Sequence, residues 1–151
     1  AQIYTAVNAS GTPQPITGGF EASAHPQGGI MLNFGTGKYL ENTDLNPPGP
    51  SYTTQTVYGI WDRYDFLNVS RPPINDTANQ PTYSGRSKLA QQSVLATTAA
   101  NADGEVFRVL NPAAAVPDYL PVNNPTHVGW YLDLPLSGER SVVPLQLINS
   151  R

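Results

Sequence analysis

Proline and glycine interrupt this chain so often that a long helix has no room between them. The 15 prolines and 13 glycines are spread along all 151 residues, and both residue types end regular segments. The pieces between them are short and rich in β-branched and aromatic residues, as strands are. We therefore predict an all-β fold in which short strands alternate with turns.

Eight segments carry the strand pattern, and each is bounded by Gly, Pro, Asn, Asp or Ser. Asp103-Gly104 lies between two of them and favours a tight hairpin, because both residues tolerate a positive φ angle. Long proline-containing loops are expected over residues 46–54 and 67–85. The strands are predicted in antiparallel, meander-like order at residues 2–7, 19–25, 29–34, 55–64, 88–99, 105–110, 128–134 and 140–148.

Composition excludes several classes of site and partner. The chain has no cysteine, which excludes disulfides, thiolate catalysis and zinc–thiolate sites. Charged residues make up 13%, the net charge is -3 and like charges do not cluster, so nothing suits a nucleic-acid backbone. No apolar run approaches the roughly 20 residues that a membrane-spanning helix needs. The chain begins at Ala1 without an initiator Met or a visible signal peptide, so we expect a processed or excised chain.

The stretch NFGTGKYLENTDL, Asn33 to Leu45, contains a Gly-Thr-Gly-Lys run of the kind that binds phosphate. A phosphate-binding loop needs Ser or Thr after its Lys, an earlier Gly and a following helix. Here Tyr39 follows Lys38, and the earlier Gly is missing. We interpret Gly35 and Gly37 as residues that let the chain turn sharply where a strand ends.

Four strings in the same order resemble the type IV pilus tip-associated adhesin and biogenesis family (PilY-type): LNFGTGKYLENTDL, TQTVYGIWDRYD, GRSKLAQQSVL and VGWYLDLPLSGERSVVPLQL. QPITGGF near the start also fits the family. The resemblance covers nearly the whole chain. It implies part of a C-terminal β-propeller, with antiparallel four-stranded blades and long loops. A blade takes roughly 40–50 residues, so 1–151 is expected to be one module of two to three blades from a larger protein.

Calcium-binding members of that family carry an Asp-rich loop, which is absent here. Asn42, Asp44 and Asn46 have the spacing of the first three ligands of a calcium loop. Pro47 occupies the position where that loop needs Gly, and no Glu follows at its twelfth position. We interpret the three residues as an Asx-rich turn and predict no tight calcium site and no cofactor.

Catalytic residues are not expected, although carboxylates are present. Asp62, Asp65, Asp133 and Glu139 are candidates for a glycosidase-type pair. Asp62 and Asp133 each follow an aromatic-rich strand, so turn caps or partners of Arg63 and Arg140 are the simpler interpretation for these two. His25 and His127 lie far apart in the sequence and belong to no nucleophile motif.

Aromatic residues on the strands supply the candidate surface-binding site. Tyr58, Trp61 and Tyr64 lie in one strand, where aromatic rings could stack on sugars or fill a core. Alternation places Tyr58 and Tyr64 on one face and Trp61 on the other. Trp130 alternates in phase with Leu132 and Leu134, so we predict that Trp130 is the more buried tryptophan.

The resemblance implies a non-catalytic structural and adhesive module that supports pilus biogenesis and surface attachment, outside the bacterial cell at the pilus tip or outer membrane. Its implied partners are the remaining blades, pilin or minor pilin subunits, and a host or abiotic surface. The isolated chain is expected to self-associate through a blade face or through sheet edges near residues 2–7 and 140–148, or to dock onto the missing blades when they are supplied. The alternative is a carbohydrate-binding module or glycoside hydrolase. A quinoprotein-like propeller enzyme is a third interpretation, but no docking Trp stands in register beside TGKYL.

Overall fold

Seven strands and one short 3-10 turn form in the part of the chain that the computed structural model describes, which is residues 3–45, 53–63, 85–121 and 125–147. The elements in chain order are β1 Glu21–Ala24, β2 Ile30–Gly35, η1 Asn42–Asp44, β3 Thr56–Asp62, β4 Ala90–Gln92, β5 Val94–Thr97, β6 Arg108–Leu110 and β7 Gly129–Asp133. No helix in these ranges is long and apolar enough to cross a membrane.

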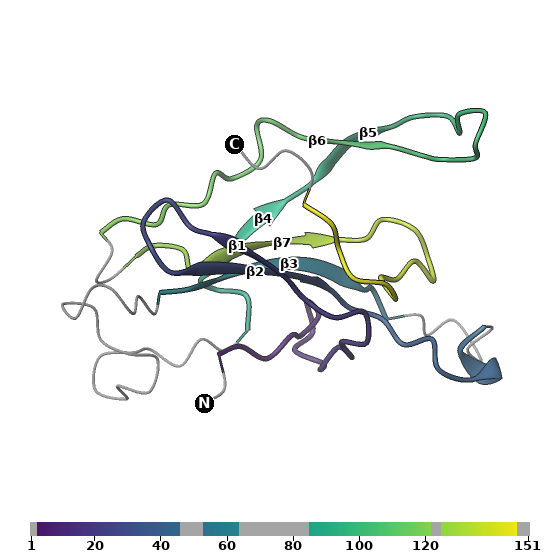
Figure 1. The fold of residues 1–151 in the computed structure, drawn as a ribbon, viewed down its shortest axis with the longest axis horizontal. Coiled ribbons are helices and arrows are strands. Elements are labelled where there is room, and N and C mark those ends of the chain that lie inside the picture. The colour runs from purple at the N-terminus through teal and green to yellow at the C-terminus, as the bar shows by residue number, and fades with distance from the viewer. Residues whose placement is uncertain (1–2, 46–52, 64–84, 122–124, 148–151) are drawn as a thin grey trace.

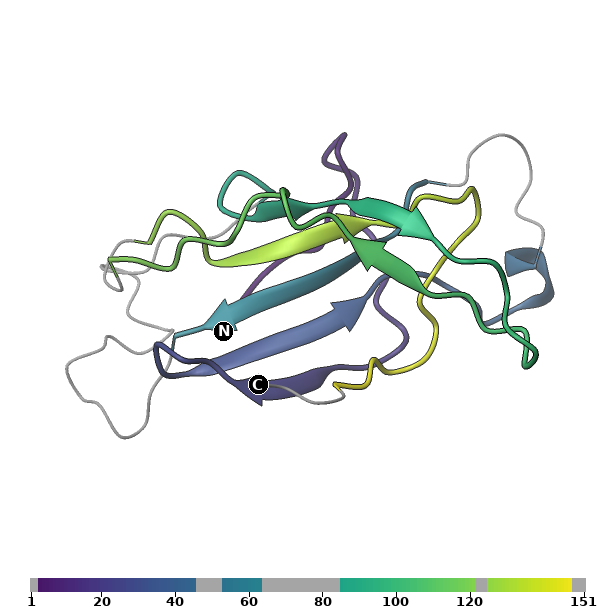
Figure 2. The same ribbon diagram turned by 90° about the horizontal axis from the view of Figure 1, so that it is seen from above.

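Strand β3 is the centre of a five-stranded sheet with the order β1-β2-β3-β7-β4. Its partners β2 and β7 both run antiparallel to it, with Tyr58 opposite Phe34 on one side and Tyr131 on the other. Strand β4 is parallel to β7. Figure 2 shows the five strands side by side. The central position pairs both edges of β3, and most of its residues are buried.

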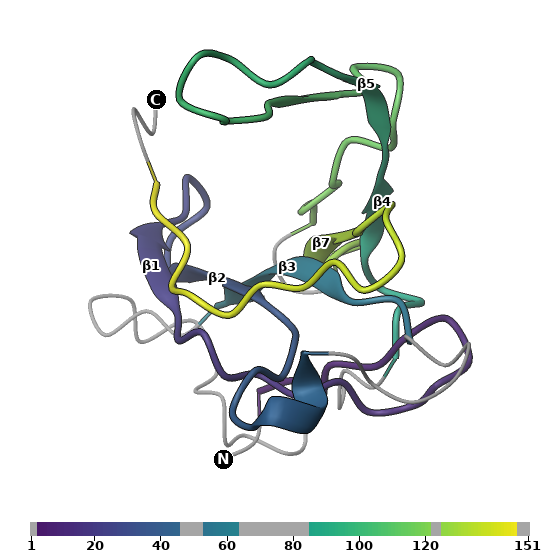
Figure 3. The same ribbon diagram turned by 90° about the vertical axis from the view of Figure 1, so that its right-hand side faces the viewer.

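The two faces of this sheet are covered by different parts of the chain (Figure 3). On one face, Tyr58 and Ile60 pack with Phe34 in a core that also contains Ala6. Ile3 and Tyr4 pack against this core, so the N-terminal segment, residues 3–16, closes that face. On the opposite face, Trp61 packs against residues outside the sheet, as described below.

Two glycines within the strands make room for close contacts. A Cβ atom on Gly35 would collide with the Ser141 side chain, and a Cβ atom on Gly59 would collide with the Trp130 indole. The C-terminal segment, residues 139–147, therefore crosses the end of β2 in contact with the backbone, and the Ser141 N–H donates to the Thr36 carbonyl at 3.0 Å. Gly35 was predicted to let the chain turn sharply, but the structure gives it a different role, a close contact with Ser141 where β2 ends.

Strands β5 and β6 form a separate two-stranded sheet. We call residues 94–110 the β5–β6 arm, and it rises away from the five-stranded sheet (Figure 1). The turn of the arm lies where Asp103-Gly104 predicted a hairpin. Gly104 has a φ of 80°, and its N–H donates to the Asn101 carbonyl at 3.0 Å. The prediction of a hairpin at this position is confirmed.

Two predicted strands do not form. Residues 3–7 contribute only isolated bridges, such as the one between Val7 and Pro13. Residues 140–147 contain no strand. Both segments lie across a face of the sheet rather than along its edge, and nearby prolines such as Pro144 remove N–H donors that a strand would need.

The predicted strand at 88–99 and the predicted meander order are also wrong. The chain forms β4 and β5 on either side of Ser93, and these two strands belong to different sheets. The order is not a meander because β7 inserts between β3 and β4, and β4 runs parallel to β7. The sheets have five and two strands instead of the expected four. Residues 46–52 and 67–84, which make up most of the two predicted long loops, lie outside the described residues.

Candidate functional site

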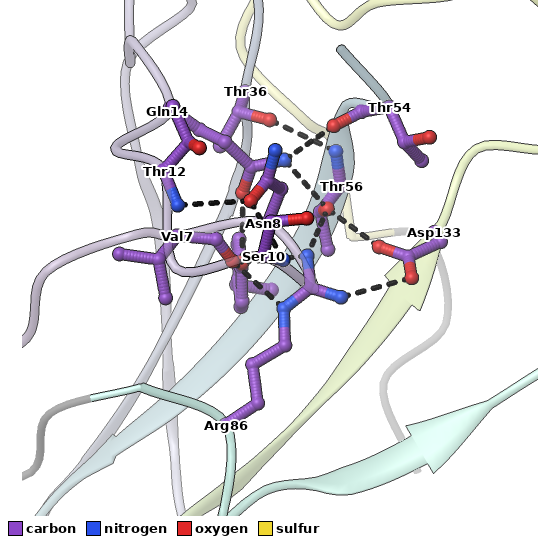
Figure 4. A network of polar contacts seen from close by, with 11 residues as sticks. Val7, Asn8, Ser10, Thr12, Gln14, Thr36, Thr54, Thr56, Arg86 and Asp133 are labelled. Carbon is purple, nitrogen blue, oxygen red and sulfur yellow. Dashed lines mark hydrogen bonds and ion pairs between the residues drawn. The ribbon is translucent and has the colours of Figure 1, made fainter.

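A polar network around Arg86 joins the N-terminal segment to the end of the central sheet (Figure 4). Arg86 follows Gly85, before β4. Thr56 and Asp133 are opposite one another on β3 and β7, while Val7 and Gln14 come from the N-terminal segment. The network therefore brings together segments that are up to 79 residues apart in the sequence.

The Arg86 guanidinium group donates to all three of these segments. Its Nε–H donates to the Val7 carbonyl at 2.7 Å, and Nη1 donates to Asp133 Oδ2 at 2.9 Å. Its Nη2 donates to Thr56 Oγ1 at 2.8 Å. The planar group also lies over the Tyr131 ring, with its carbon atom 4.5 Å from the ring centroid. Such a rigid fork of donors suits a site with several fixed acceptors.

Thr56 and Gln14 complete the network. The Thr56 hydroxyl donates to Asp133 Oδ1 at 2.7 Å and accepts from Gln14 Nε2 at 2.9 Å. The second Gln14 N–H donates to the Thr54 carbonyl at 2.7 Å. The Tyr58 hydroxyl lies 2.8 Å from Gln14 Oε1 and accepts from Arg86 at 3.2 Å. Buried polar groups contribute to stability when they are paired in this way.

The charges in the network stabilise each other. The side chains of Arg86 and Asp133 are only 11% and 30% exposed. Burial acts to lower the pKa of Arg86, but the hydrogen bond to Asp133, the interactions with Tyr58 and the charge of Asp133 together outweigh it and raise the pKa above its usual value. Burial, together with the nearby Tyr58, raises the pKa of the Tyr4 hydroxyl. Arg86 and Tyr4 therefore keep their protons at neutral pH.

This arrangement is suited to holding the fold together. The donors and acceptors described above are used by neighbouring groups of the same chain, and no Ser–His or Cys–His pair is part of the network. Its chemistry is that of a cross-link between the N-terminal segment, β3 and β7.

The structure contradicts the surface-binding hypothesis for two of its three aromatic residues. Tyr58 is 0% exposed and Trp61 is 1% exposed. Trp61 stacks on His25 with ring centroids 4.4 Å apart, meets Tyr119 edge-on and donates from Nε1 to the Gly28 carbonyl at 2.8 Å. Neither ring is available to a sugar, and Tyr64 lies outside the described residues.

The prediction that Trp130 is the more buried tryptophan is also wrong. Trp130 is only half-buried, with its indole on the backbone of Gly59. Alternation assigned Trp61 and Gly59 to a common face correctly. It could not reveal that His25 and Tyr119, from outside β3 and β7, cover Trp61.

The candidate carboxylates are engaged in separate places. Asp133 belongs to the Arg86 network, and Glu139 forms an ion pair with Arg108. Asp62 also has an interaction partner, and Asp65 lies outside the described residues. Asp133 is ion-paired with an arginine, as the simpler interpretation expected, but the arginine is Arg86.

Asp44 caps the turn that was weighed as a calcium loop. Its Oδ2 atom accepts from the Leu40 and Glu41 N–H groups at 2.8 and 3.1 Å. The Leu40 bond contributes most to holding the Asp44 pKa below its usual value. Across the described ranges, no group of three or more His, Asp or Glu side chains could hold a metal ion. Asn46 is outside these ranges, so the prediction of no tight calcium site stays a prediction.

The Arg86 network was missed in the sequence. The sequence feature that could have indicated the network was Asp133, a charged residue in a strand whose neighbours are aromatic or aliphatic. A carboxylate in such a position needs a partner. Nothing in the sequence pointed to Arg86, which follows the long segment 67–85.

Comparisons with known proteins place the chain among type IV pilus proteins. The family model of the PilY1 β-propeller domain matches residues 1–99. The type IV pilus biogenesis factor PilY1 of Pseudomonas aeruginosa strain PAO1 is 32% identical over 139 residues, which cover 90% of this chain and 11% of that protein. A PilY1 homolog of Xylella fastidiosa is 28% identical over 137 residues, or 91% of this chain and 7% of the homolog.

A solved structure agrees with this assignment. The crystal structure of the P. aeruginosa PilY1 C-terminal domain superimposes with a TM-score of 0.68 and 29% identity, covering 94% of this chain and 28% of that domain. The chain thus spans a small part of its relatives. The predicted family resemblance and the expectation of an all-β partial propeller are confirmed, and the chain belongs to the PilY1 β-propeller domain family.

Proposed function

We propose that this chain is a non-catalytic structural and adhesive module of a type IV pilus tip-associated protein, where it supports pilus biogenesis and surface attachment. The observation that carries the proposal is the match of residues 1–99 to the PilY1 β-propeller family. Its relative in P. aeruginosa is named a type IV pilus biogenesis factor.

A structural role is supported by how the chain uses its polar side chains. The ion pairs of Asp133 with Arg86 and of Glu139 with Arg108 hold segments of the fold together. The burial of Tyr58 and Trp61 removes two of the three aromatic rings on which the carbohydrate-binding alternative depended.

The location and partners follow from the same proposal. Residues 1–151 form one propeller-derived module, at the cell surface or pilus tip of a bacterium. Its partners are further blades, pilin or minor pilin subunits, and the host or abiotic surface to which the cell attaches.

Replacement of the matched segment in P. aeruginosa PilY1 by residues 1–151 tests the role in biogenesis. We expect more surface pili in the strain with the chimera than in a strain whose PilY1 lacks that segment. The same chimera with Arg86→Ala should give fewer pili, while Lys38→Ala, which alters an exposed ion pair, should not. A chimera that is stable and reaches the cell surface but gives no pili would contradict the proposal.

Attachment and catalysis are tested separately. Attached cells are counted at equal pilus number, and normal piliation with no attachment would contradict the adhesive part alone. Incubation of the purified chain with a glycan panel should release no reducing sugar. Hydrolysis that scales with protein concentration would contradict the non-catalytic assignment.

A further inference from the structure

The β5–β6 arm exposes apolar side chains that nothing in the described part of the chain covers. Leu95 is 61% exposed, Phe107 58% and Val109 48%. Figures 1 and 3 show the arm standing clear of the five-stranded sheet. Contiguous exposed apolar surface on a folded protein marks an interaction site.

The arm also has an open strand edge. Strand β6 pairs with β5, and within the described residues no other strand pairs with it. The Thr98 N–H donates to the Phe107 carbonyl and the Asn111 N–H to the Ser93 carbonyl, both at 2.9 Å. Because alternate residues of an antiparallel strand point their backbone groups to opposite sides, those of Arg108 and Leu110 are directed away from β5. Such an edge can accept another strand.

The arm is held in place before any partner arrives. At its base, Arg108 forms an ion pair with Glu139 of the C-terminal segment, and Gln92 Nε2 donates to the Ala115 carbonyl at 2.7 Å. At its tip, Asn101 Oδ1 accepts from the N–H of Glu105 at 2.8 Å. A two-stranded ribbon is only marginally stable by itself. A ribbon that is fixed in place and exposes apolar side chains is therefore suited to joining a larger sheet.

We propose that the outer edge of β6 takes up an apolar β-strand from an adjoining blade of a PilY1-type propeller. The chain covers 28% of the solved PilY1 C-terminal domain, so most of that domain is available to supply such a strand. The chemistry of the arm fits this partner: backbone groups of β6 hydrogen-bond to the strand, and Phe107, Val109 and Leu110 contact its apolar side chains. A polyanion does not fit, because Arg108 is paired with Glu139.

The proposed interface differs from the edges expected from the sequence. Residues 3–7 and 140–147 form no strands and lie across the sheet. Strand β6 offers an open edge at a different place, in the two-stranded sheet.

Amide hydrogen exchange tests the proposal in a chimera that carries residues 1–151 in place of the matched segment of the P. aeruginosa PilY1 C-terminal domain. We expect the Arg108 and Leu110 amides to exchange at least ten times more slowly in the chimera than in the isolated chain. The Thr98 and Asn111 amides, which are bonded within the arm, serve as internal controls and should change little. Equal exchange of Arg108 and Leu110 in a folded chimera would overturn the proposal. Protection that appears only when the chimera dimerises would assign the edge to a second copy and would also overturn it.

If the chimera does not fold, association of the isolated chain tests whether the uncovered β6 edge accepts a strand at all, with a second copy standing in for the missing blade. With the edge uncovered, the weight-average mass from light scattering should rise with concentration. Leu110→Lys, which places a charge on the edge, should abolish this rise, whereas Leu40→Lys should not. Leu40 is the matched control because it is equally apolar and more exposed, and lies beside η1. A chain that stays monomeric, or two variants that behave alike, would overturn the proposal.

Discussion

Arg86 stabilises the fold by connecting segments that are distant in the sequence. Its guanidinium group bonds to Val7 in the N-terminal segment, to Thr56 in β3 and to Asp133 in β7. Without Arg86, each of these acceptors would lose a hydrogen-bond partner at a position that water reaches poorly. Arg86 therefore stabilises the fold mainly by hydrogen-bonding these acceptors, and less by its own burial.

Substitution Arg86→Ala is expected to destabilise the chain by about 2–3 kcal/mol, because it leaves the Asp133 carboxylate partly buried without its charge partner. Arg86→Lys should recover part of the loss, since it restores the charge but not the fork of donors. Urea unfolding measures both. Lys38→Ala is the control and should leave the midpoint close to wild type. A loss for Arg86→Ala no larger than that of the control would contradict a stabilising network.

The two tryptophans differ in a way that their strands alone do not reveal. Trp61 is 1% exposed and contacts His25, Tyr119 and Gly28, whereas Trp130 is only half-buried. Burial raises the pKa of Tyr119 to about 12, so this phenol remains neutral beside Trp61 over the physiological range.

Trp61→Ala should therefore cost about 3–5 kcal/mol, as expected for a large buried side chain, and Trp130→Ala should cost clearly less. The measurement is the free energy of unfolding of each variant in urea. Near-ultraviolet circular dichroism of each folded variant serves as a control for intact packing. Equal losses, or a larger loss for Trp130→Ala, would mean that the enclosure of Trp61 contributes little.

At the scale of elements, β2 depends on glycine where the C-terminal segment crosses it. Gly35→Ala is expected to destabilise the chain by about 1–3 kcal/mol, because the added methyl group overpacks the contact with Ser141. Ser141→Gly makes room for that methyl group, so the double variant should recover much of the loss. Urea midpoints of the two single variants and the double variant form the test. Additive losses would show that Gly35 and Ser141 do not interact.

The turn around η1 should respond to acid through Asp44. The pKa of this carboxyl is lowered in the folded state, chiefly by the Leu40 N–H. Its contribution is therefore complete above the pKa of an unfolded aspartate, and is lost as the pH falls through the lower folded value. We expect the NMR signals of the Leu40 and Glu41 amides to move together, with a midpoint below that of ordinary aspartates. Asp44→Asn should remove this titration, and its persistence would assign it to another group.

The sequence located most strands well but not how they are arranged. Turn residues and β-branched runs marked β1, β2, β3, β6 and β7 to within a few residues, since these signals are local. The parallel pairing of β4 with β7 depends on contacts between distant residues. The same holds for the site: Asp133 was a candidate as a carboxylate, but its partner Arg86 is 47 residues away in the sequence.

For the whole molecule, the N-terminal segment acts as part of the core. Ala6 and Gln14 are buried, the rings of Tyr4 and Tyr58 lie 5.4 Å apart, and the Tyr4 hydroxyl donates to the Gly85 carbonyl at 3.1 Å. These contacts close one face of the sheet without adding a strand to it.

A chain that starts at residue 18 should therefore lose cooperative unfolding and bind a dye specific for exposed apolar surface. The matched control shortens the tip of the β5–β6 arm between Thr98 and Phe107, where the residues are exposed. This control should keep a sharp urea transition with little dye binding. Cooperative unfolding of the truncated chain would contradict a core role for residues 3–16.

The central position of β3 has a consequence for the order of folding. Strand β2 precedes β3 closely, but the other neighbour, β7, follows much later, and bonded residues such as Thr56 and Asp133 are 77 positions apart. A nascent chain therefore exposes one edge of its central, largely buried strand until residues 129–133 have been synthesised. Long-range pairing of this kind slows folding, and an unpaired apolar edge favours aggregation. Between the synthesis of β3 and that of β7, this chain is therefore most exposed to aggregation with other chains.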